Sequence, residues 1–586
     1  MAKYFTKACE NSTKTYTSIK LQSFFHSEYY AECIFFITFA MQNDESSFRT
    51  KVIRQYSMFY YSFFKSNAWR TIAVMAILVS SLAIRFYWAT QKEGMHIDEV
   101  ASFSIAECDG AYYSPDVQIP TNMDITGKEL KSLFFFHDTR VKGVLHDLRY
   151  MWYNVYDYNH TNFYYSLLRI FFIGSDTTDI STIQMRGILL NMLFYVLEFA
   201  LFLCLLLVYW RDRPLLVFTG LVCFAFMVGG VSDTLFIRPY ELQTLMVLLL
   251  ALWLTHVVRS MNRDAWRYNV KNFVITSFAL AGVLWTGYFM VILVCILGAF
   301  LLWETYRHDK LKVGLPYFIG TAVFSLLICY CLYQSYFLGF GGDQRIDNKY
   351  DGNIIFMLTS LCISILHWGW LIAKYTIYLP VIVMLVIIAI LCRHQKRQIP
   401  WIILPMTIYT VVIMCLAPDF VNRYMVSATP PILLAIPTVL SMIQNHRRTT
   451  ITASLIILLY IAFPLFKRNI DNLYLKKPMF ELLTNNEHDI YLMQDCHLWL
   501  TAIVPQVKDD ITYHVRDTLL TNDRLKSGDI VIWHNKKTKM VNDDAQSSKT
   551  IVWCYIKGER PCDKDIANKS TVADDTHWSY EFYVIK

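Results

Sequence analysis

The chain has 586 residues, of which 55% are hydrophobic and only 17% are charged, and its formal net charge is +7. Soluble proteins carry about 25% charged residues, so this composition and the repeated long apolar runs exclude an ordinary soluble enzyme and indicate a polytopic α-helical membrane protein. Excess Lys and Arg in such a protein mark cytoplasmic loops, so the positive charge does not predict nucleic-acid binding.

The apolar runs divide the chain into three regions. Residues 1–70 hold only a short apolar stretch and are expected to form an N-terminal cytoplasmic extension or to reflect an upstream start. Residues 71–466 form the membrane region, and residues 467–586 form a C-terminal domain. Hydrophobic windows predict about eleven transmembrane helices, at residues 71–90, 187–209, 214–231, 235–257, 273–286, 288–303, 314–337, 375–392, 401–418, 425–443 and 450–466.

Basic clusters predict the orientation of these helices. With a cytoplasmic N-terminus, the clusters between spans all lie on the cytoplasmic side, and they are Arg211 and Arg213; Arg259, Arg263, Arg267 and Lys271; Arg307, Lys310 and Lys312; Arg393, Lys396 and Arg397; and Arg447 and Arg448. The large first loop, residues 91–186, and the tail are then external. Short β-branched and aromatic segments predict that the tail is a small extracytoplasmic α/β or α+β domain.

Two apolar stretches need a special interpretation, because simple spans would move basic loops to the outside. Residues 273–303 are predicted to form two short helices that turn at Thr286-Gly287. Residues 354–372 are predicted to form an interfacial helix on the outer face, with aromatic side chains at the level of the headgroups.

An acidic pair follows the first apolar run, in the tetrad His96-Ile97-Asp98-Glu99. Carboxylates held at a membrane boundary are costly and therefore indicate a function. One of the two is suited to act as a base beside a lipid-borne substrate, while Glu99 or His96 tunes it. The alternative interpretation is a solvated cap at a helix end.

A second polar group closes the same external loop. Asp157 and His160 precede the aromatic pair Tyr164-Tyr165, where the chain returns to the membrane surface. We expect His160, Tyr164 and Tyr165, with His96, to contact substrate. The alternative is an amphipathic interfacial helix whose aromatic side chains lie among the headgroups.

Three arginines open predicted spans at the outer boundary, namely Arg186, Arg238 and Arg423. A guanidinium group is always charged and matches phosphate oxygens with a planar fork of donors. The three therefore predict a clamp for a phosphate or diphosphate head group, to which Tyr240 and Tyr424 add hydroxyl groups and stacking faces. Arginines that snorkel at helix ends are the alternative.

In their order along residues 70–466, these motifs resemble the membrane-embedded GT-C glycosyltransferases. The similarity is to the bacterial branch that contains lipopolysaccharide-core sugar transferases, aminoarabinose–lipid A transferases and protein O-mannosyltransferases. It is carried by His96-Ile97-Asp98-Glu99, Asp157-x-x-His160-x-x-x-Tyr164-Tyr165, Arg186, Arg238-x-Tyr240 and Arg423-Tyr424. The segment that starts at Asp157 lacks the proline pair that relatives carry after the histidine.

The resemblance implies transfer of a sugar from a polyprenyl-phosphate carrier to a lipid, glycan or protein acceptor at the outer face. Asp98 would be the catalytic base, Asp157 the second acid, and Arg238 and Arg423 the carrier-phosphate arginines. A single displacement needs no metal, although a divalent ion on Asp98, Glu99 and Asp157 is an alternative that some relatives use. The expected location is a bacterial inner membrane.

Three other functions fit parts of the sequence. A transporter or flippase of lipid-linked sugars would carry internal repeats and polar groups at mid-membrane, which this chain lacks at the sequence level. A lipid-linked glycan ligase or polymerase would place its large loop late in the chain, whereas this chain has it between spans one and two. A non-catalytic scaffold for surface-glycan assembly is the third.

Overall fold

The computed structural model describes residues 68–92, 94–107, 122–136, 138–153, 161–175, 177, 179–333, 354–395, 399–417, 421–473, 487–493, 507–516, 529–536, 566–573 and 578–585. The chain divides into two compact units, Met1–Ile72 and Ala73–Lys586. Of the predicted extension over residues 1–70, only residues 68–70 are among the described residues.

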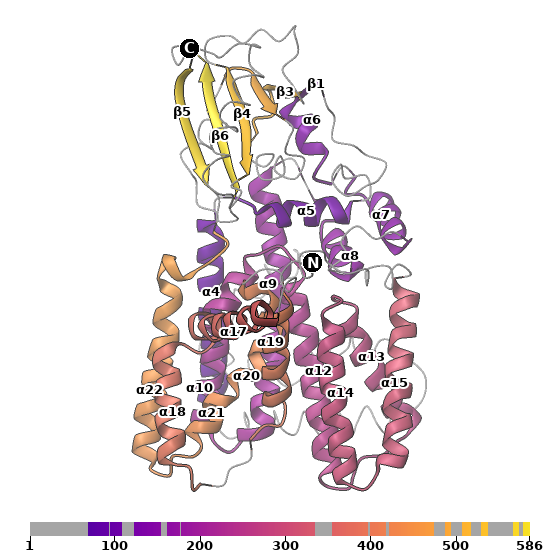
Figure 1. Ribbon diagram of the computed structural model, residues 1–586, viewed down its shortest axis with the longest axis vertical. Coiled ribbons are helices and arrows are strands. Elements are labelled where there is room, and N and C mark those ends of the chain that lie inside the picture. The colour runs from indigo at the N-terminus through magenta and orange to yellow at the C-terminus, as the bar shows by residue number, and fades with distance from the viewer. Residues whose placement is uncertain are drawn as a thin grey trace, which may run out of the picture. The chain divides into compact units, whose positions relative to one another are not determined.

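Long apolar helices form the membrane region (Figure 1). Among the described residues, seven helices are long and apolar enough to cross a membrane, and a pair bent by 46° would make an eighth. The seven lie in α4 (Ala68–Gln91), α9 (Ile180–Trp210), α12 (Tyr240–Met261), α14 (Met290–Arg307), α15 (Leu311–Leu332), α17 (Ile354–Leu371) and α22 (His446–Ala462), and the bent pair is α10 (Pro214–Ala225) and α11 (Val228–Thr234).

The expected number of about eleven spans is too high by this criterion, although the described part of every predicted run is mainly helical. The helices α13 (Val270–Leu284), α18 (Leu379–Leu391) and α19 (Ile403–Leu416) have only 15, 13 and 14 residues, whereas a span needs about 20. Residues 425–443 are divided by prolines into the short helices η5 (Val426–Ala428), α20 (Thr429–Leu433) and α21 (Ala435–Leu440).

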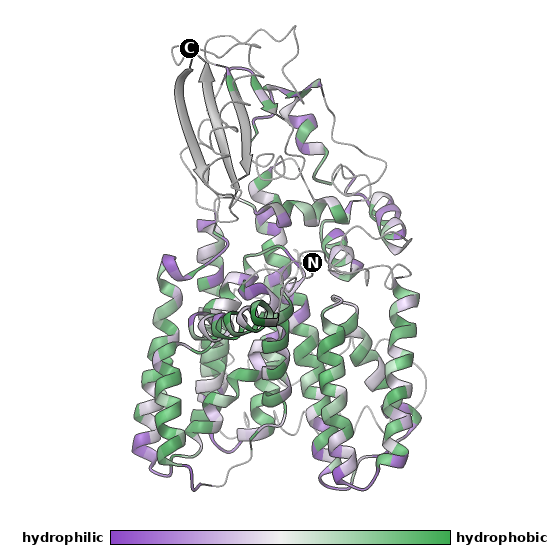
Figure 2. Cartoon of the chain, in the orientation of Figure 1, coloured by the Kyte–Doolittle hydropathy of each residue, from purple (hydrophilic) through white to green (hydrophobic). Residues whose placement is uncertain are grey.

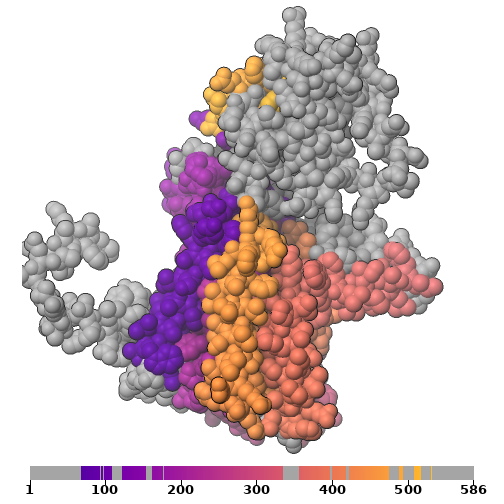
Figure 3. Space-filling view, turned by 90° about the vertical axis from the view of Figure 1, so that its left-hand side faces the viewer, coloured from indigo at the N-terminus to yellow at the C-terminus, as the bar shows by residue number. Residues whose placement is uncertain are grey.

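The predicted helical hairpin over residues 273–303 is confirmed, because α13 ends at Leu284 and α14 begins at Met290. The predicted interfacial helix is α17, which continues into the π-helical turn η3 (Ile372–Thr376). Its composition meets the criterion for a span, yet Figures 1 and 3 show it projecting crosswise from the bundle beside α18. This direction is the one that an interfacial helix requires.

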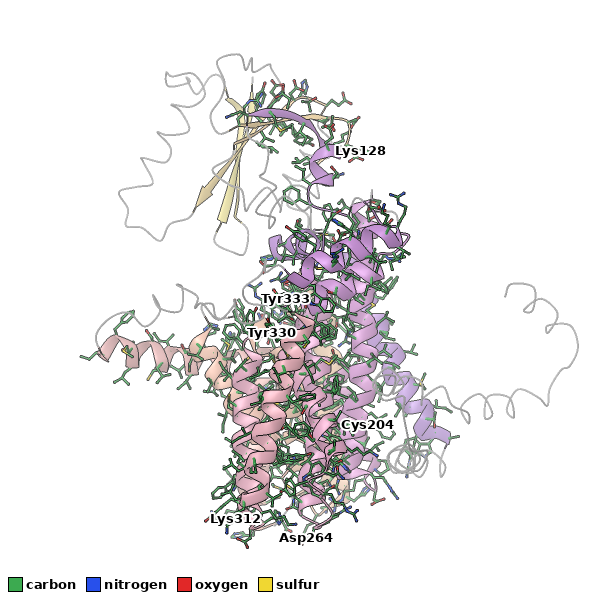
Figure 4. The ribbon with its side chains drawn as sticks, turned by 90° about the vertical axis from the view of Figure 1, so that its right-hand side faces the viewer. Lys128, Cys204, Asp264, Lys312, Tyr330 and Tyr333 are labelled. Atoms are coloured by element: carbon green, nitrogen blue, oxygen red, sulfur yellow. The ribbon has the colours of Figure 1, made fainter. Side chains whose placement is uncertain are left out.

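Polar residues lie mainly at the two ends of the helical bundle, and basic loops gather at one of them. Hydrophobic residues cover the lengths of the helices, and hydrophilic residues gather toward their ends (Figure 2). At one end, Lys310 pairs with Asp264 across 2.9 Å, which joins the loops after α14 and α12. Figure 4 shows Asp264 and Lys312 at this end and Tyr330 and Tyr333 toward the other. The basic loops after α12 and α14 therefore share one end of the bundle, as the sequence predicts.

The described part of the first loop contains four short helices, which are α5 (Ile97–Ala106), α6 (Gly127–Ser132), α7 (Val141–Tyr153) and α8 (Asn162–Phe171). Phe103, Phe136 and Phe172 pack edge to face in its core, with ring centroids 5.1 to 5.6 Å apart. Arg169 is fully buried, packs over Phe136 and binds Asp147 at 2.6 Å. A buried ion pair of this kind fixes the angle at which α8 meets α7.

The C-terminal sheet takes its first strand from this loop. Its order is β1-β3-β2-β4-β6-β5, with β2 parallel to both neighbours and the other pairs antiparallel. The strands are β1 (Met123–Thr126), β2 (Ile490–Met493), β3 (Thr512–Arg516), β4 (Ile530–Lys536), β5 (Ile566–Ala573) and β6 (Trp578–Ile585). The small mixed sheet confirms the β content of the tail, but a domain that starts at residue 467 leaves out β1.

An ionic cluster fastens β1 to β3 and gives this contact a dependence on pH. His514 Nδ1 lies 2.7 Å and Arg516 Nη2 lies 2.6 Å from Asp124 Oδ1. The hydrogen bond to His514, with help from Arg516, holds the pKa of Asp124 below its ordinary value. A carboxylate of this type stabilises the fold above its unfolded pKa, and the contribution is lost as pH falls through the folded pKa.

We therefore expect β1 to keep its hydrogen-exchange protection from neutral pH down to about pH 4, and to lose part of it below that pH. Asp124→Asn should lose the same protection at neutral pH, because a neutral amide attracts the Arg516 guanidinium less and accepts a weaker hydrogen bond from it. Peptide-resolved hydrogen exchange over residues 122–127 measures both effects. Asp212→Asn, in the exposed loop after α9, is the control, and equal protection in both variants would refute the role of the cluster.

Candidate functional site

The acidic tetrad forms the start of α5, and a capping box explains why the helix begins there. His96 is the N-cap, and its Nδ1 accepts a hydrogen bond from the backbone N–H of Asp98 at 3.0 Å. In return, Glu99 Oε2 accepts from the backbone N–H of His96 at 2.7 Å. The two bonds satisfy helix N–H groups that would otherwise lack partners. They also direct Asp98 and Glu99 to different surroundings.

Asp98 faces a small cavity, within which the centres of water molecules have about 100 Å³ of space. Its side chain is 31% exposed, and its Oδ2 lies 2.7 Å from Nη1 of Arg423, which is itself 24% exposed. The cavity is lined by Asp98, Arg238, Tyr240, Gln243, Gly287, Phe289, Met290, Tyr409, Arg423 and Tyr424. These residues come from α5, α12, the tip of the α13–α14 hairpin, α19 and the turn before α20.

Arg238 enters from the segment that leads into α12. Its Nη1 donates to the backbone oxygen of Asp98 at 3.3 Å, to Ser102 Oγ at 3.4 Å and to Tyr165 OH at 3.1 Å. Two residues later, Tyr240 stacks nearly parallel to Phe236, with ring centroids 6.1 Å apart. The start of α12 therefore supplies a cation and a phenol ring to one wall.

Arg423 lies in the 3-10 turn η4 (Asn422–Tyr424), close to the rings of Phe236 and Tyr424. Burial opposes its charge, but the facing Tyr240 and Asp98 together raise the pKa of Arg423 above its ordinary value. Its Nε has no hydrogen-bond partner among the described residues. With two guanidinium groups and one carboxylate, the lining carries one excess positive charge and is suited to bind an anion.

The tip of the α13–α14 hairpin closes another side of the cavity. Gln243 Nε2 donates to the backbone oxygen of Thr286 at 2.9 Å. On the other side, Trp285 Nε1 donates to Asn162 Oδ1 at 2.8 Å, and the Trp285 ring stacks on Phe163 at 4.1 Å. Thr161 Oγ1 also donates to the backbone oxygen of Trp285. The hairpin is thereby clamped between α12 and α8, and its tip is a fixed wall.

Most of the predicted phosphate-binding residues converge. Asp98 meets Arg238, Tyr240, Arg423 and Tyr424 around one cavity, although the first and last of them are 326 positions apart in the sequence. Tyr165 stands behind them and holds Arg238, whereas Tyr164 donates to Asn191 Oδ1 at 3.2 Å, away from the lining. His96 caps α5 and contacts Asp98. Asp157 and His160 lie outside the described residues.

Arg186 is a correction to the predicted clamp, because it does not line the cavity. Its span starts earlier than expected, at Ile180, where Asp179 caps α9. Arg186 then lies in the second turn, and its Nε and Nη2 donate to the backbone oxygen of Phe171 at 3.0 and 2.8 Å. Arg186 therefore holds the end of α8. Two of its three guanidinium nitrogens already donate to a backbone oxygen, so it is poorly placed to bind a phosphate.

Glu99 also lies away from the cavity. It is fully buried and paired with Lys92, so it is not placed for proton transfer with a substrate. The described residues contain no group of three His, Cys, Asp or Glu side chains placed to hold a metal ion. Of the proposed metal trio, Glu99 already uses both of its oxygens to accept hydrogen bonds.

Several lining residues were missed at the level of sequence. Gln243 and Tyr409 are polar side chains within apolar runs, one turn and more inside their helices, and that contrast was the available signal. Phe289 and Met290 are ordinary apolar residues that the hairpin brings to the cavity, so no local pattern distinguishes them. Lys92, which does not line the cavity, is a basic residue directly after the first apolar run, where the orientation predicted from the sequence leads one to expect few basic residues.

A comparison with solved structures finds a structural similarity. The chain matches the crystal structure of ArnT from Cupriavidus metallidurans bound to undecaprenyl phosphate over 87% of this chain and 97% of that one, with 10% sequence identity and a TM-score of 0.40. No protein-family model matches the chain, and no curated protein matches it by sequence. We base the functional proposal on the residues of the cavity.

The cavity predicts which arginines bind an anion. Arg238→Gln and Arg423→Gln should each weaken binding of farnesyl phosphate about tenfold or more, since each removes a charged donor. Arg186→Gln should leave the affinity unchanged within twofold, because Arg186 lies at the end of α8. Binding to the purified protein in nanodiscs measures all three. An equal loss in the Arg186 variant would contradict the geometry described above.

Proposed function

We propose that the chain is a membrane glycosyltransferase of the GT-C type, which moves a sugar from a polyprenyl-phosphate carrier to a hydroxyl group of a lipid, glycan or protein acceptor. One observation supports this most strongly: a partly exposed carboxylate shares a small cavity with two guanidinium groups at the boundary of the membrane region. The carboxylate can accept a proton, and the guanidinium groups can bind a lipid phosphate.

The transfer is a single displacement. The acceptor oxygen forms a bond to the anomeric carbon while its proton passes to an oxygen of Asp98. The bond from the anomeric carbon to the phosphate oxygen breaks, and its electron pair leaves with the lipid phosphate. Arg238 and Arg423 stabilise the negative charge that grows on this phosphate. The configuration at the anomeric carbon inverts.

The ion pair between Asp98 and Arg423 has a role in this scheme. A carboxylate beside a guanidinium group is a weak base, since the positive charge favours its ionised form. The phosphodiester of the donor carries one negative charge, as Asp98 does, and its two non-bridging oxygens can compete with the carboxylate for the same guanidinium group. Binding of the donor would draw Arg423 toward the phosphate and release Asp98 to accept the proton. The base is then active mainly when the donor is present.

The surroundings fit a substrate with an apolar tail. Phe289, Met290 and the ring of Tyr409 line the cavity beside the charged groups. The α14 helix that carries Met290 is exposed along much of its length and is one of the apolar candidate spans. A prenyl chain could therefore lie along α14 in the bilayer while its phosphate reaches the arginines. The outer face and a bacterial inner membrane are the proposed location.

Asp98→Asn should reduce the turnover by about 10²-fold or more, because general-base catalysis contributes about 10²–10⁴-fold. The amide keeps the size of the side chain, so insertion and melting temperature should stay close to wild type. The assay follows release of undecaprenyl phosphate from a panel of undecaprenyl-phosphate pentoses and hexoses, with acceptors supplied as membrane extracts. Mass spectrometry of the copurified lipid guides the choice of donor.

Asp264→Asn, in the exposed loop after α12, is the matched control and should turn over at the wild-type rate. Near wild-type turnover of Asp98→Asn would remove Asp98 from the mechanism. A wild-type protein that binds undecaprenyl phosphate but releases none from any donor in the panel would count against a transferase.

A further inference from the structure

The buried ion pair of Lys92 and Glu99 lies directly behind the cavity. Lys92 Nζ is 2.5 Å from Glu99 Oε1, and both side chains are 0% exposed. Burial raises the pKa of Glu99 and lowers that of Lys92, while the attraction between the two opposes both shifts. The surrounding hydrogen bonds to Glu99 favour its ionised form.

Three chain segments meet at this pair. Lys92 follows the last residue of α4, and its Nζ also donates to the backbone oxygen of Leu235 at 2.7 Å. Glu99 Oε1 accepts from the backbone N–H of Ile237 at 3.0 Å, and Oε2 accepts from that of His96. A single carboxylate thus joins the end of α4, the start of α5 and the segment that enters α12.

The neighbours of these bonded residues are the functional ones. Asp98 precedes Glu99, and Arg238 follows Ile237. A shift of the Ile237 amide relative to Glu99 therefore changes the distance between the proposed base and a proposed phosphate ligand. Gln184 Nε2 adds a bond to the backbone oxygen of Lys92 at 3.0 Å, which ties the same point to α9.

We propose that Lys92 and Glu99 are positioning residues that hold Asp98 in register with Arg238, an inference that rests on the proposed function. Energetics argue for a geometric role. Taking two charges out of water is costly, and apolar side chains of similar size often stabilise a fold equally well. A well-packed apolar pair could fill this space, but it could not accept the N–H groups of Ile237 and His96 and so could not set their positions.

The test compares single and double variants in nanodiscs. Lys92→Met and Glu99→Met should each lower the melting temperature strongly, because each leaves one buried charge without its partner. The double variant Lys92→Met/Glu99→Met should recover most of that loss. Its turnover should nevertheless stay about 10- to 100-fold below wild type, since a misplacement near 1 Å can cost about 10²-fold. Its affinity for farnesyl phosphate should fall less than in Arg238→Gln, because the double variant keeps both the Arg238 and Arg423 charges at the cavity.

Lys131→Met is the matched control, since it removes an ion pair that is also close, to Asp509 at 2.7 Å, but is more exposed. It should change neither turnover nor affinity. A double variant with wild-type turnover would overturn the inference. If the double variant does not fold, Lys92→Arg is tested in its place, because it keeps the positive charge but changes the shape of the side chain. Wild-type turnover of Lys92→Arg would then overturn the inference.

A readout without turnover separates this inference from the proposed function. Hydrogen exchange at the Ile237 amide should accelerate in the double variant, or in Lys92→Arg if the double variant does not fold, while exchange along the body of α12 stays as in wild type. Acceleration with no transfer by the wild-type protein would leave the coupling intact and refute the transferase. Unchanged exchange at Ile237 would refute the coupling, whatever the activity.

Discussion

The ion pair between Asp98 and Arg423 is the contact on which the site depends. It joins residues that are 325 positions apart, one from the loop after α4 and one from the turn before α20. Neither group is fully solvated, so the attraction between them is stronger than it would be in water. Arg238 adds a second positive charge, so the cavity carries an excess positive charge that suits it to bind an anion. The carboxylate of Asp98 is a possible proton acceptor in the same cavity.

The rest of the architecture keeps these few groups in place. The capping box starts α5 at His96, so Asp98 faces the cavity while Glu99 faces inward. Tyr165 and the backbone of Asp98 hold Arg238, and the clamp on the hairpin tip fixes the wall opposite. Hydrogen bonds between partly buried groups hold these positions well, because a hydrogen bond in surroundings of low dielectric constant is stronger than one in water.

Sequence reasoning selected residues that the structure brings to one cavity where a charged residue was costly for its setting. Asp98, Arg238 and Arg423 are charged groups at the ends of apolar runs, and the free-energy cost of such groups indicates function. The same reasoning failed for Arg186, because an arginine at a helix end has the same local sequence whether it binds a ligand or a backbone oxygen. Only the position of the start of α9, seven residues earlier than predicted, separates the two cases.

Other parts could not be predicted because they depend on distant contacts. Strand β1 has four residues within a long loop, and its partner β3 comes almost 390 residues later, so no local pattern indicates it. The number of spans was overestimated because apolar composition alone does not show where a helix ends. Within residues 375–443, prolines and helix ends divide the apolar runs into pieces shorter than a span, and these ends depend on packing. Lys92 carries a sequence signal, but its partner Glu99 becomes apparent only through three-dimensional contacts.

The most direct test is a cryo-electron-microscopy structure of the protein in nanodiscs with farnesyl phosphate bound. The account predicts phosphate density within hydrogen-bond distance of Arg423, with the guanidinium drawn beyond about 4 Å from the carboxylate of Asp98, the usual limit of an ion pair. Phosphate bound elsewhere, with Asp98 and Arg423 still in contact, would contradict it.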